Sequence, residues 1–195
     1  MPNKRRHLMP SNPYSPPAAD CTMGKDLLCA FYVVSKRKLA VLFVATLGLY
    51  FMYWSYRNWK NYRAATAVRV MPSVRAVMSV WFTYALFRAI DRRIYATGFR
   101  YKWYPRFLAL TFILLCVLES TRIWILDLQL SLAILMVLLT LQVSCLMRVQ
   151  VAINYLADDA SGRQNSTLSP INWMWIVLGL CWWGLLTSLI LAGLS

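Results

Sequence analysis

Two ionisable side chains, Glu119 and Arg122, lie inside a long apolar stretch of this chain. Charge at membrane depth is costly and often marks a proton or ion path. The two residues are three apart, so on a helix they would share one face and could pair. By helix rise from Arg106, Glu119 lies about two-thirds of the way across a bilayer, and Arg122 can reach the far interface. A structural ion pair, an interfacial position and a working role in transport or catalysis are all compatible with this spacing, and we expect the ion pair.

Signatures of enzymes, metal sites and cofactor sites are absent from the sequence. The single histidine, His7, excludes a histidine-based triad and a histidine metal cluster. Five cysteines without C-x-x-C spacing, three of them in apolar runs, suggest small buried side chains instead of a zinc site or a disulfide framework. No phosphate-cradling glycine motif occurs. We therefore expect no catalytic residues, no metal, no cofactor, and a protein that is not an enzyme.

The composition is that of a membrane protein. Of the 195 residues, 59% are hydrophobic and 14% are charged, against about 25% charged residues in an ordinary soluble domain. The net charge is +14, from 21 Lys and Arg against 7 Asp and Glu. Such an excess can indicate nucleic acid, but here the basic residues flank apolar runs, where they meet anionic headgroups. The expected partner is a lipid bilayer with anionic headgroups, joined by other membrane proteins or a second copy, and not nucleic acid.

Four apolar runs are long enough to cross a bilayer as helices, given a hydrocarbon core of about 30 Å. They cover about residues 39–56, 107–126, 130–147 and 171–194. Residues 1–34 are rich in Pro, Ser and charge, which predicts a disordered cytoplasmic tail. The predicted fold class is therefore all-α: a polytopic integral membrane helical bundle over residues 35–195.

A fifth helix is predicted over residues 73–94, and its relation to the membrane is open. Only 12 residues separate Arg75 from Arg88, which is short for a span, so the helix crosses the membrane or lies in its interface. The basic residues number seven before the first run, four over 57–69 and six over 88–106. Crossing would place the two larger groups in the cytoplasm, so the positive-inside rule favours five crossings, a cytoplasmic N-terminus and an external C-terminus.

Aromatic and basic side chains at the ends of these runs predict contact with lipid headgroups. The expected interfacial anchors are Trp54, Arg57, Trp59, Lys60, Trp103, Trp173 and Trp175.

Other polar and small residues within the runs suggest helix packing. Gln142, Ser144 and Gln150 could form hydrogen bonds between helices. Gly179 and Gly184 could admit a close neighbour.

Four stretches resemble a family of uncharacterised bacterial inner-membrane proteins: NPYSPP (12–17), TLGLYFMYWSYRNW (46–59), VAINYLADDASGRQNS (151–166) and NWMWIVLG (172–179). Those proteins pair an N-P-Y-x-P-P tail with a T-x-G-x-Y-x-x-Y-W-x-Y-[RK]-x-W first membrane segment. The resemblance implies a multi-pass protein of the bacterial cytoplasmic (inner) membrane. The family has no established activity, so the resemblance assigns no role to any residue.

The expected function is that of an integral membrane protein that packs with other membrane proteins or engages anionic lipid. The alternative is a small-solute or proton pathway that uses Glu119 and Arg122.

Overall fold

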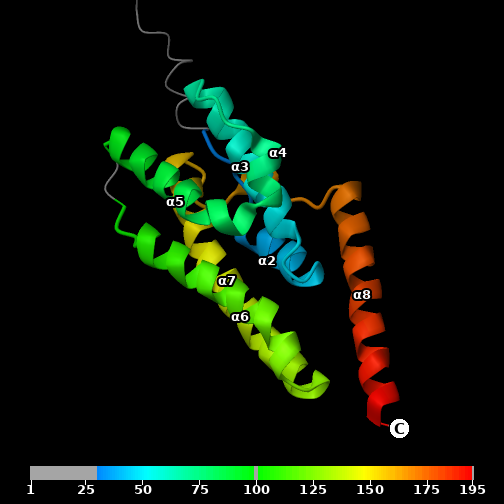
Figure 1. The fold of residues 1–195 in the computed structure, drawn as a ribbon. Helices are drawn as coiled ribbons and strands as arrows, with labels where there is room; N and C mark the ends of the chain where they lie inside the picture. The colour runs from blue at the N-terminus through cyan, green and yellow to red at the C-terminus, as the bar shows by residue number, and fades with distance from the viewer. Residues whose placement is uncertain (1–29, 99–100, 195) are drawn as a thin grey trace, which may run out of the picture.

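The described part of the chain is helical throughout. The computed structural model describes residues 30–98 and 101–194, and its regular elements there are seven α-helices and one short 3-10 helix, Arg163–Asn165 (Figure 1). The predicted all-α fold class is therefore confirmed for these residues. Residues 1–29, which hold most of the predicted tail together with His7, lie outside the described residues.

The first apolar run forms two helices instead of one. Helix α2 covers Lys36–Ala45. Ser35 caps its N-terminus, because its hydroxyl accepts a hydrogen bond from the Lys38 N–H at 3.3 Å. Helix α3 covers Tyr50–Thr66. Between them Leu47 and Gly48 have φ of 50° and 85°, and the Gly48 N–H donates to the Phe43 carbonyl at 2.8 Å. This left-handed turn ends α2, and the chain turns back (Figure 1), so the prediction of one straight span over 39–56 is wrong.

The segment predicted as one helix over 73–94 is also broken. Helix α4, Pro72–Val77, ends at Met78, where φ and ψ are −94° and 35°. Helix α5 follows over Ser79–Ala96. The short α4 packs mainly against α3, whereas α5 packs against α6. A helix of six residues rises only about 9 Å, so this segment does not form a continuous span.

Helices α6, Pro105–Ile125, and α7, Leu128–Leu156, form an antiparallel pair. Only Leu126 and Asp127 lie between them. The Asp127 carboxylate caps α7 by accepting a hydrogen bond from the Leu130 N–H at 2.9 Å, which makes a tight turn without glycine or proline. The third predicted run, 130–147, is too short: α7 continues past the exposed Arg148 and keeps a buried face up to Leu156.

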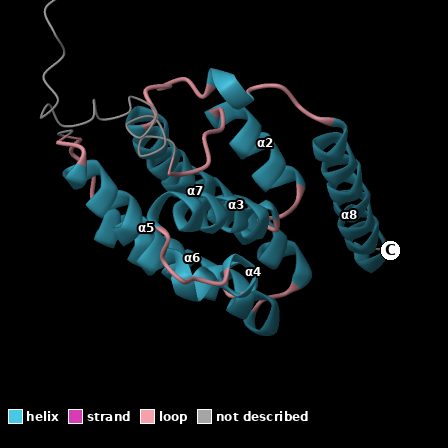
Figure 2. Ribbon diagram, turned by 90° about the horizontal axis from the view of Figure 1, so that it is seen from above, coloured by secondary structure: helices cyan, strands magenta, loops and turns pink. Residues whose placement is uncertain are grey.

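Helix α8, Pro170–Leu194, matches the fourth predicted run and stands at one side of the molecule (Figures 1 and 2). Its main contact is with α2. A Cβ on Gly179 would overlap the Ala45 carbonyl oxygen, and the Trp183 Nε1 donates to the Val44 carbonyl at 3.2 Å. Gly179 therefore admits a close neighbour, as predicted. A Cβ on Gly184, by contrast, would have no neighbouring segment of the described chain within 4 Å.

Two helices of the described chain are long and apolar enough to cross a membrane: α7 and residues Pro170–Leu189 of α8. In the most apolar stretch of α8 only 17% of the residues are buried, against 44% in α7. Helix α7 is thus partly a core helix, whereas α8 exposes most of its apolar surface.

Replacement of Gly179 by alanine should weaken the contact between α8 and α2. The added methyl group would overlap the Ala45 carbonyl, and overpacking of this kind costs about 1–3 kcal/mol. We expect a lower midpoint of thermal unfolding in detergent. The matched control is Gly184→Ala, which should leave the midpoint unchanged or raise it, because alanine is the better helix former. Equal shifts in the two variants would contradict this account of the contact.

Candidate functional site

Glu119 and Arg122 share one face of α6, and that face is turned toward α7. The Glu119 Oε2 accepts a hydrogen bond from the Gln142 Nε2 at 2.7 Å. The Arg122 Nη1 donates to the Ser131 carbonyl at 2.9 Å and also to the Ser131 hydroxyl. Each side chain has a partner on the neighbouring helix, and the structure has no ion pair between them. The expected ion pair is thus replaced by two separate hydrogen-bonded contacts with α7.

Gln142 is the buried partner of this cluster. Its amide also lies 3.7 Å from the Cys116 sulfur. The prediction that Gln142 and Gln150 form hydrogen bonds between helices is confirmed, since Gln150 bonds to Trp54 on α3. The same prediction for Ser144 is wrong, because its hydroxyl donates to the Thr140 carbonyl of its own helix.

A cavity of about 440 Å³ adjoins this cluster. Its walls come from the turn between α2 and α3, the start of α5, and the facing sides of α6 and α7. Both helix breaks meet there: Gly48 lies in one break and Ser79 directly follows the other. Glu119, Arg122 and Gln142 provide most of the polarity of a wall that is otherwise largely apolar. A carboxylate beside an amide in such surroundings can hold a proton or receive a cationic group.

A second polar cluster lies deeper in the protein and holds an extended segment, residues 30–35. The Tyr32 N–H donates to the Asn58 Oδ1 at 3.1 Å, and the Gln150 Nε2 donates to the Tyr32 carbonyl at 3.0 Å. The Asn154 Nδ2 donates to the Val34 carbonyl at 3.0 Å. Tyr32 and Val34 are buried, so the predicted disordered tail does not extend to residue 34. Side-chain amides replace the backbone partners that a helix or sheet would provide.

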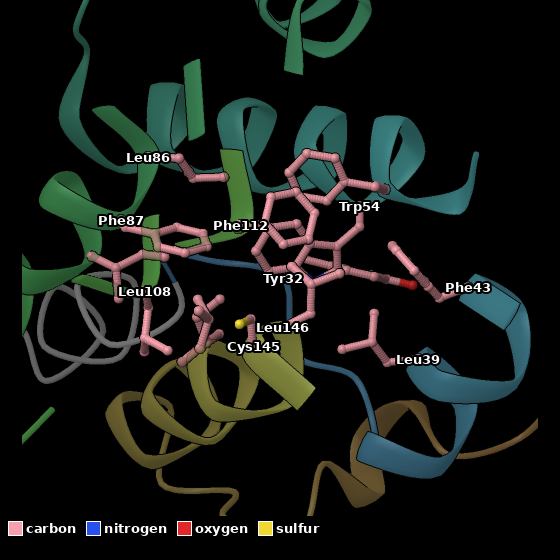
Figure 3. Close-up of a cluster of buried hydrophobic side chains, with 14 of the residues drawn as sticks. Tyr32, Leu39, Phe43, Trp54, Leu86, Phe87, Leu108, Phe112, Cys145 and Leu146 are labelled. Carbon is pink, nitrogen blue, oxygen red and sulfur yellow. The ribbon is translucent and has the colours of Figure 1, made fainter. Parts of the chain in front are cut away.

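Trp54 belongs to the same cluster. Its Nε1 donates to the Gln150 Oε1 at 2.7 Å, and Gln150 in turn donates to the Asn154 Oδ1 at 2.7 Å. All three side chains are 0% exposed, and Figure 3 shows Trp54 beside Tyr32 in the core. The prediction of Trp54 as an interfacial anchor is wrong. A ring with one polar edge suits an interface, but here a buried amide satisfies that edge.

The loop between α7 and α8 closes over this segment. The N–H groups of Gln164 and Arg163 each donate to the Asp159 carboxylate at 3.0 Å, and these bonds hold the pKa of Asp159 below its ordinary value. The loop positions Asn165, whose Nδ2 donates to the Tyr32 hydroxyl at 2.8 Å. The Asn165 Oδ1 accepts from the Lys38 Nζ at 2.6 Å. The stretch DDASG is therefore an exposed turn whose shape is fixed by the Asp159 carboxylate.

The remaining predicted anchors differ in their surroundings. Trp59 is only 2% exposed. The Arg57 guanidinium lies 4.8 Å from the centre of the Tyr32 ring, and the Trp103 Nε1 donates to the Asp91 Oδ1 at 3.1 Å. These three residues therefore contact the protein itself, and the prediction that Trp59 meets the headgroups is wrong.

Lys60 and two tryptophans of α8 differ from those three. Lys60 is exposed on α3, and Trp173 and Trp175 are 56% and 37% exposed on α8. These side chains remain available to lipid.

Sequence reasoning missed the asparagines of the buried cluster: Asn58, Asn154 and Asn165. A signal for them is present in the sequence, because Gln150 and Asn154 are one helical turn apart in an otherwise apolar helix. Such a pair of amides in a core needs partners, since a buried polar group without a hydrogen bond is costly. The missing information was the identity of those partners, which lie about 100 residues away in the chain.

Replacement of Gln150 by leucine should destabilise the protein strongly. The change leaves the Trp54 Nε1 and the Tyr32 carbonyl buried without a partner, at about 1–3 kcal/mol for each group. We expect a large drop in the unfolding midpoint in detergent. Gln129→Leu, at an exposed position of the same helix, is the control and should change the midpoint little. A midpoint for Gln150→Leu as high as that of the control would show that the cluster is not needed for the fold.

Comparison of the chain with protein-family models, with curated proteins and with solved structures found no match. The resemblance to bacterial inner-membrane proteins therefore stays a prediction from the quoted stretches.

Proposed function

We propose that this chain is an integral protein of the bacterial cytoplasmic membrane. We further propose that it engages anionic lipid through its basic residues. The exposed apolar surface of α8 is the observation that supports this most. The helix has 25 residues and would rise about 37 Å, more than a hydrocarbon core of about 30 Å. It bears no charged residue, and apolar side chains are exposed along its length: Ile171, Trp173, Met174, Val177, Leu178, Leu180, Trp182, Leu185 and Leu189. A helix that is apolar on all sides is suited to lipid.

In this proposal α6, α7 and α8 cross the membrane. If α7 crosses, α6 must lie at the same depth, because only Leu126 and Asp127 separate the two antiparallel helices. Helices α2 and α3 then form a re-entrant pair that turns back at Gly48, and α2 packs against α7. Irregular backbone of this kind is tolerated at membrane depth where protein surrounds it.

The distribution of charge supports one orientation. The turn between α6 and α7 and the C-terminal end of α8 lie at the same end of the molecule (Figure 1). The charged residues of this end of the three helices are Glu119, Arg122 and Asp127. The opposite ends of the same helices and their flanks carry the basic residues Lys102, Arg106, Arg148 and Arg163 and the acidic residues Asp158 and Asp159. The positive-inside rule places the basic end in the cytoplasm, next to the anionic lipid of that leaflet.

Cysteine labelling in intact cells tests the proposed topology. In a chain with its five cysteines replaced by alanine, Gln129→Cys should react with a membrane-impermeant maleimide from outside. Ser166→Cys should react only after the cells are permeabilised. Reaction of both positions from the same side would refute the crossing of α7.

Lipid engagement has its own readouts. The protein should stay in the pellet after a carbonate wash, and anionic phospholipid should be enriched in the material that copurifies in mild detergent. Release into the supernatant would exclude membrane integration, and copurified lipid with the composition of the whole membrane would exclude the lipid preference.

The cavity beside Glu119 favours a second candidate, a pathway for protons or a small solute. Transporter sites are typically formed where broken helices meet polar groups at mid-membrane, and this cavity combines the breaks at Gly48 and Met78 with Glu119, Arg122 and Gln142. The carboxylate of Glu119 is the group that would carry a proton.

Glu119→Gln should abolish any proton flux that the purified protein supports in vesicles. The amide cannot exchange a proton at neutral pH, yet it is nearly the same size and can keep a hydrogen bond to Gln142. Flux is measured with an enclosed pH-sensitive dye under an imposed pH gradient. Asp158→Asn, at an exposed position outside the helices, is the control. Flux no higher than in empty vesicles, or full flux in the Glu119 variant, rules out this role.

A further inference from the structure

A cleft of about 430 Å³ lies between α3, α4 and α5, apart from the cavity beside Glu119. Its basic residues are Arg75 on α4 and Arg88 and Arg92 on α5. Its remaining walls are aromatic or small and apolar: Trp59, Tyr62, Val68, Val70, Tyr84, Ala85 and Ala89. Three arginine side chains therefore line one hollow with aromatic sides.

The positive charge of this cleft is not neutralised by the described part of the protein, where no carboxylate forms an ion pair with these arginines. Arg88 and Arg92 are one turn apart on α5, a spacing at which like charges repel. The nearest acidic residue along the helix, Asp91, accepts a hydrogen bond from the Trp103 Nε1 instead. Repulsion between these arginines lowers the stability of the protein, and an anion bound in the cleft would offset it.

Arg75 is held in place by aromatic rings. Its guanidinium lies 4.1 Å from the centre of the Trp59 ring and 5.1 Å from that of Phe82. Stacking on a ring uses the flat face of a guanidinium and leaves its N–H donors free at the edge. Trp59 itself is 2% exposed, and its Nε1 has no hydrogen-bond partner in the described part of the structure. The wall of the cleft thus contains ordered donors without an acceptor.

Exposed apolar side chains lie beside the cleft. Val68 lines the cleft and is exposed, and Met71, on the loop before α4, is 71% exposed. Trp81, one turn before the cleft residues of α5, is 78% exposed. A soluble phosphate compound would gain nothing from these side chains, whereas the acyl chains of a lipid would cover them.

We propose that this cleft binds the phosphate group of an anionic phospholipid headgroup. Guanidinium groups fit phosphate oxygens with paired, charge-assisted hydrogen bonds, and a net negative headgroup neutralises more of the arginine charge than a zwitterionic one. This inference rests on the proposed function, because a headgroup reaches the cleft only if α4 and α5 lie at the membrane surface. It goes further by assigning lipid preference to three arginines instead of to the overall positive charge.

Binding is measured by native mass spectrometry of the full-length protein in detergent, titrated with phosphatidylglycerol, phosphatidylcholine or glycerol 3-phosphate. The test variant is Arg88→Gln with Arg92→Gln. The control is Lys36→Gln with Arg37→Gln, which removes the same charge from exposed positions on α2. We expect the wild type to prefer phosphatidylglycerol, the test variant to lose at least about tenfold in affinity, and the control less than about threefold.

A second variant, Ala85→Phe, keeps every charge and fills the cleft from an exposed position of α5. It should also lose at least about tenfold in affinity for phosphatidylglycerol, and it decides the test if the arginine variant does not fold. Full affinity in Ala85→Phe overturns the proposal.

The remaining outcomes separate the two proposals. Equal losses in the test and control variants overturn the cleft but leave general attraction to anionic lipid standing. If the wild type shows no preference for phosphatidylglycerol over phosphatidylcholine, both the cleft and the general attraction to anionic lipid are overturned. Binding of glycerol 3-phosphate as tight as that of phosphatidylglycerol identifies a soluble phosphate compound as the ligand and overturns the lipid source.

Discussion

The structure depends on how an extended segment is held inside an apolar bundle of helices. Residues 30–35 form no helix, so their backbone N–H and carbonyl groups need partners from elsewhere. Asn58 on α3, Gln150 and Asn154 on α7, and Asn165 in the following loop provide them. Each amide both donates and accepts, so the cluster leaves few of these buried groups unpaired. The segment thereby fixes α3 against α7. Through Asn165 it also holds the loop that leads into α8.

The charged side chains, like the buried backbone groups, have uncharged partners. In the described part of the protein, cations and carboxylates do not pair with one another: Glu119 bonds to an amide and Arg122 to Ser131, while Arg57 and Arg75 lie over aromatic rings. With 21 basic and 7 acidic residues, the chain has too few carboxylates to neutralise its cations. Rings and carbonyl groups stabilise individual guanidiniums without removing their charge, so a large positive potential remains for an external anion.

Helix length divides the molecule into two parts. Helices α6, α7 and α8 have 21, 29 and 25 residues, whereas α2 to α5 are interrupted at the turn around Gly48 and at Met78. The interruptions bring turns of α2–α3 and α4–α5 next to the polar face of α6, which creates the cavity beside Glu119. The cleft with Arg75, Arg88 and Arg92 forms where α4 folds back against α3. Both hollows therefore result from breaks in helices and not from the long helices alone.

The sequence by itself determined the helical class, the bounds of α6 and α8, the common face of Glu119 and Arg122, and the close approach at Gly179, because periodicity, proline and glycine act locally. Tertiary structure alone decided the break near Gly48, the burial of Trp54 and Trp59, and the partners of Glu119. Trp54 shows the reason: a tryptophan followed by basic residues satisfies the same pattern at a lipid interface and in a core. The difference lies in Gln150, 96 residues away in the chain, and a contact over that separation leaves no local trace.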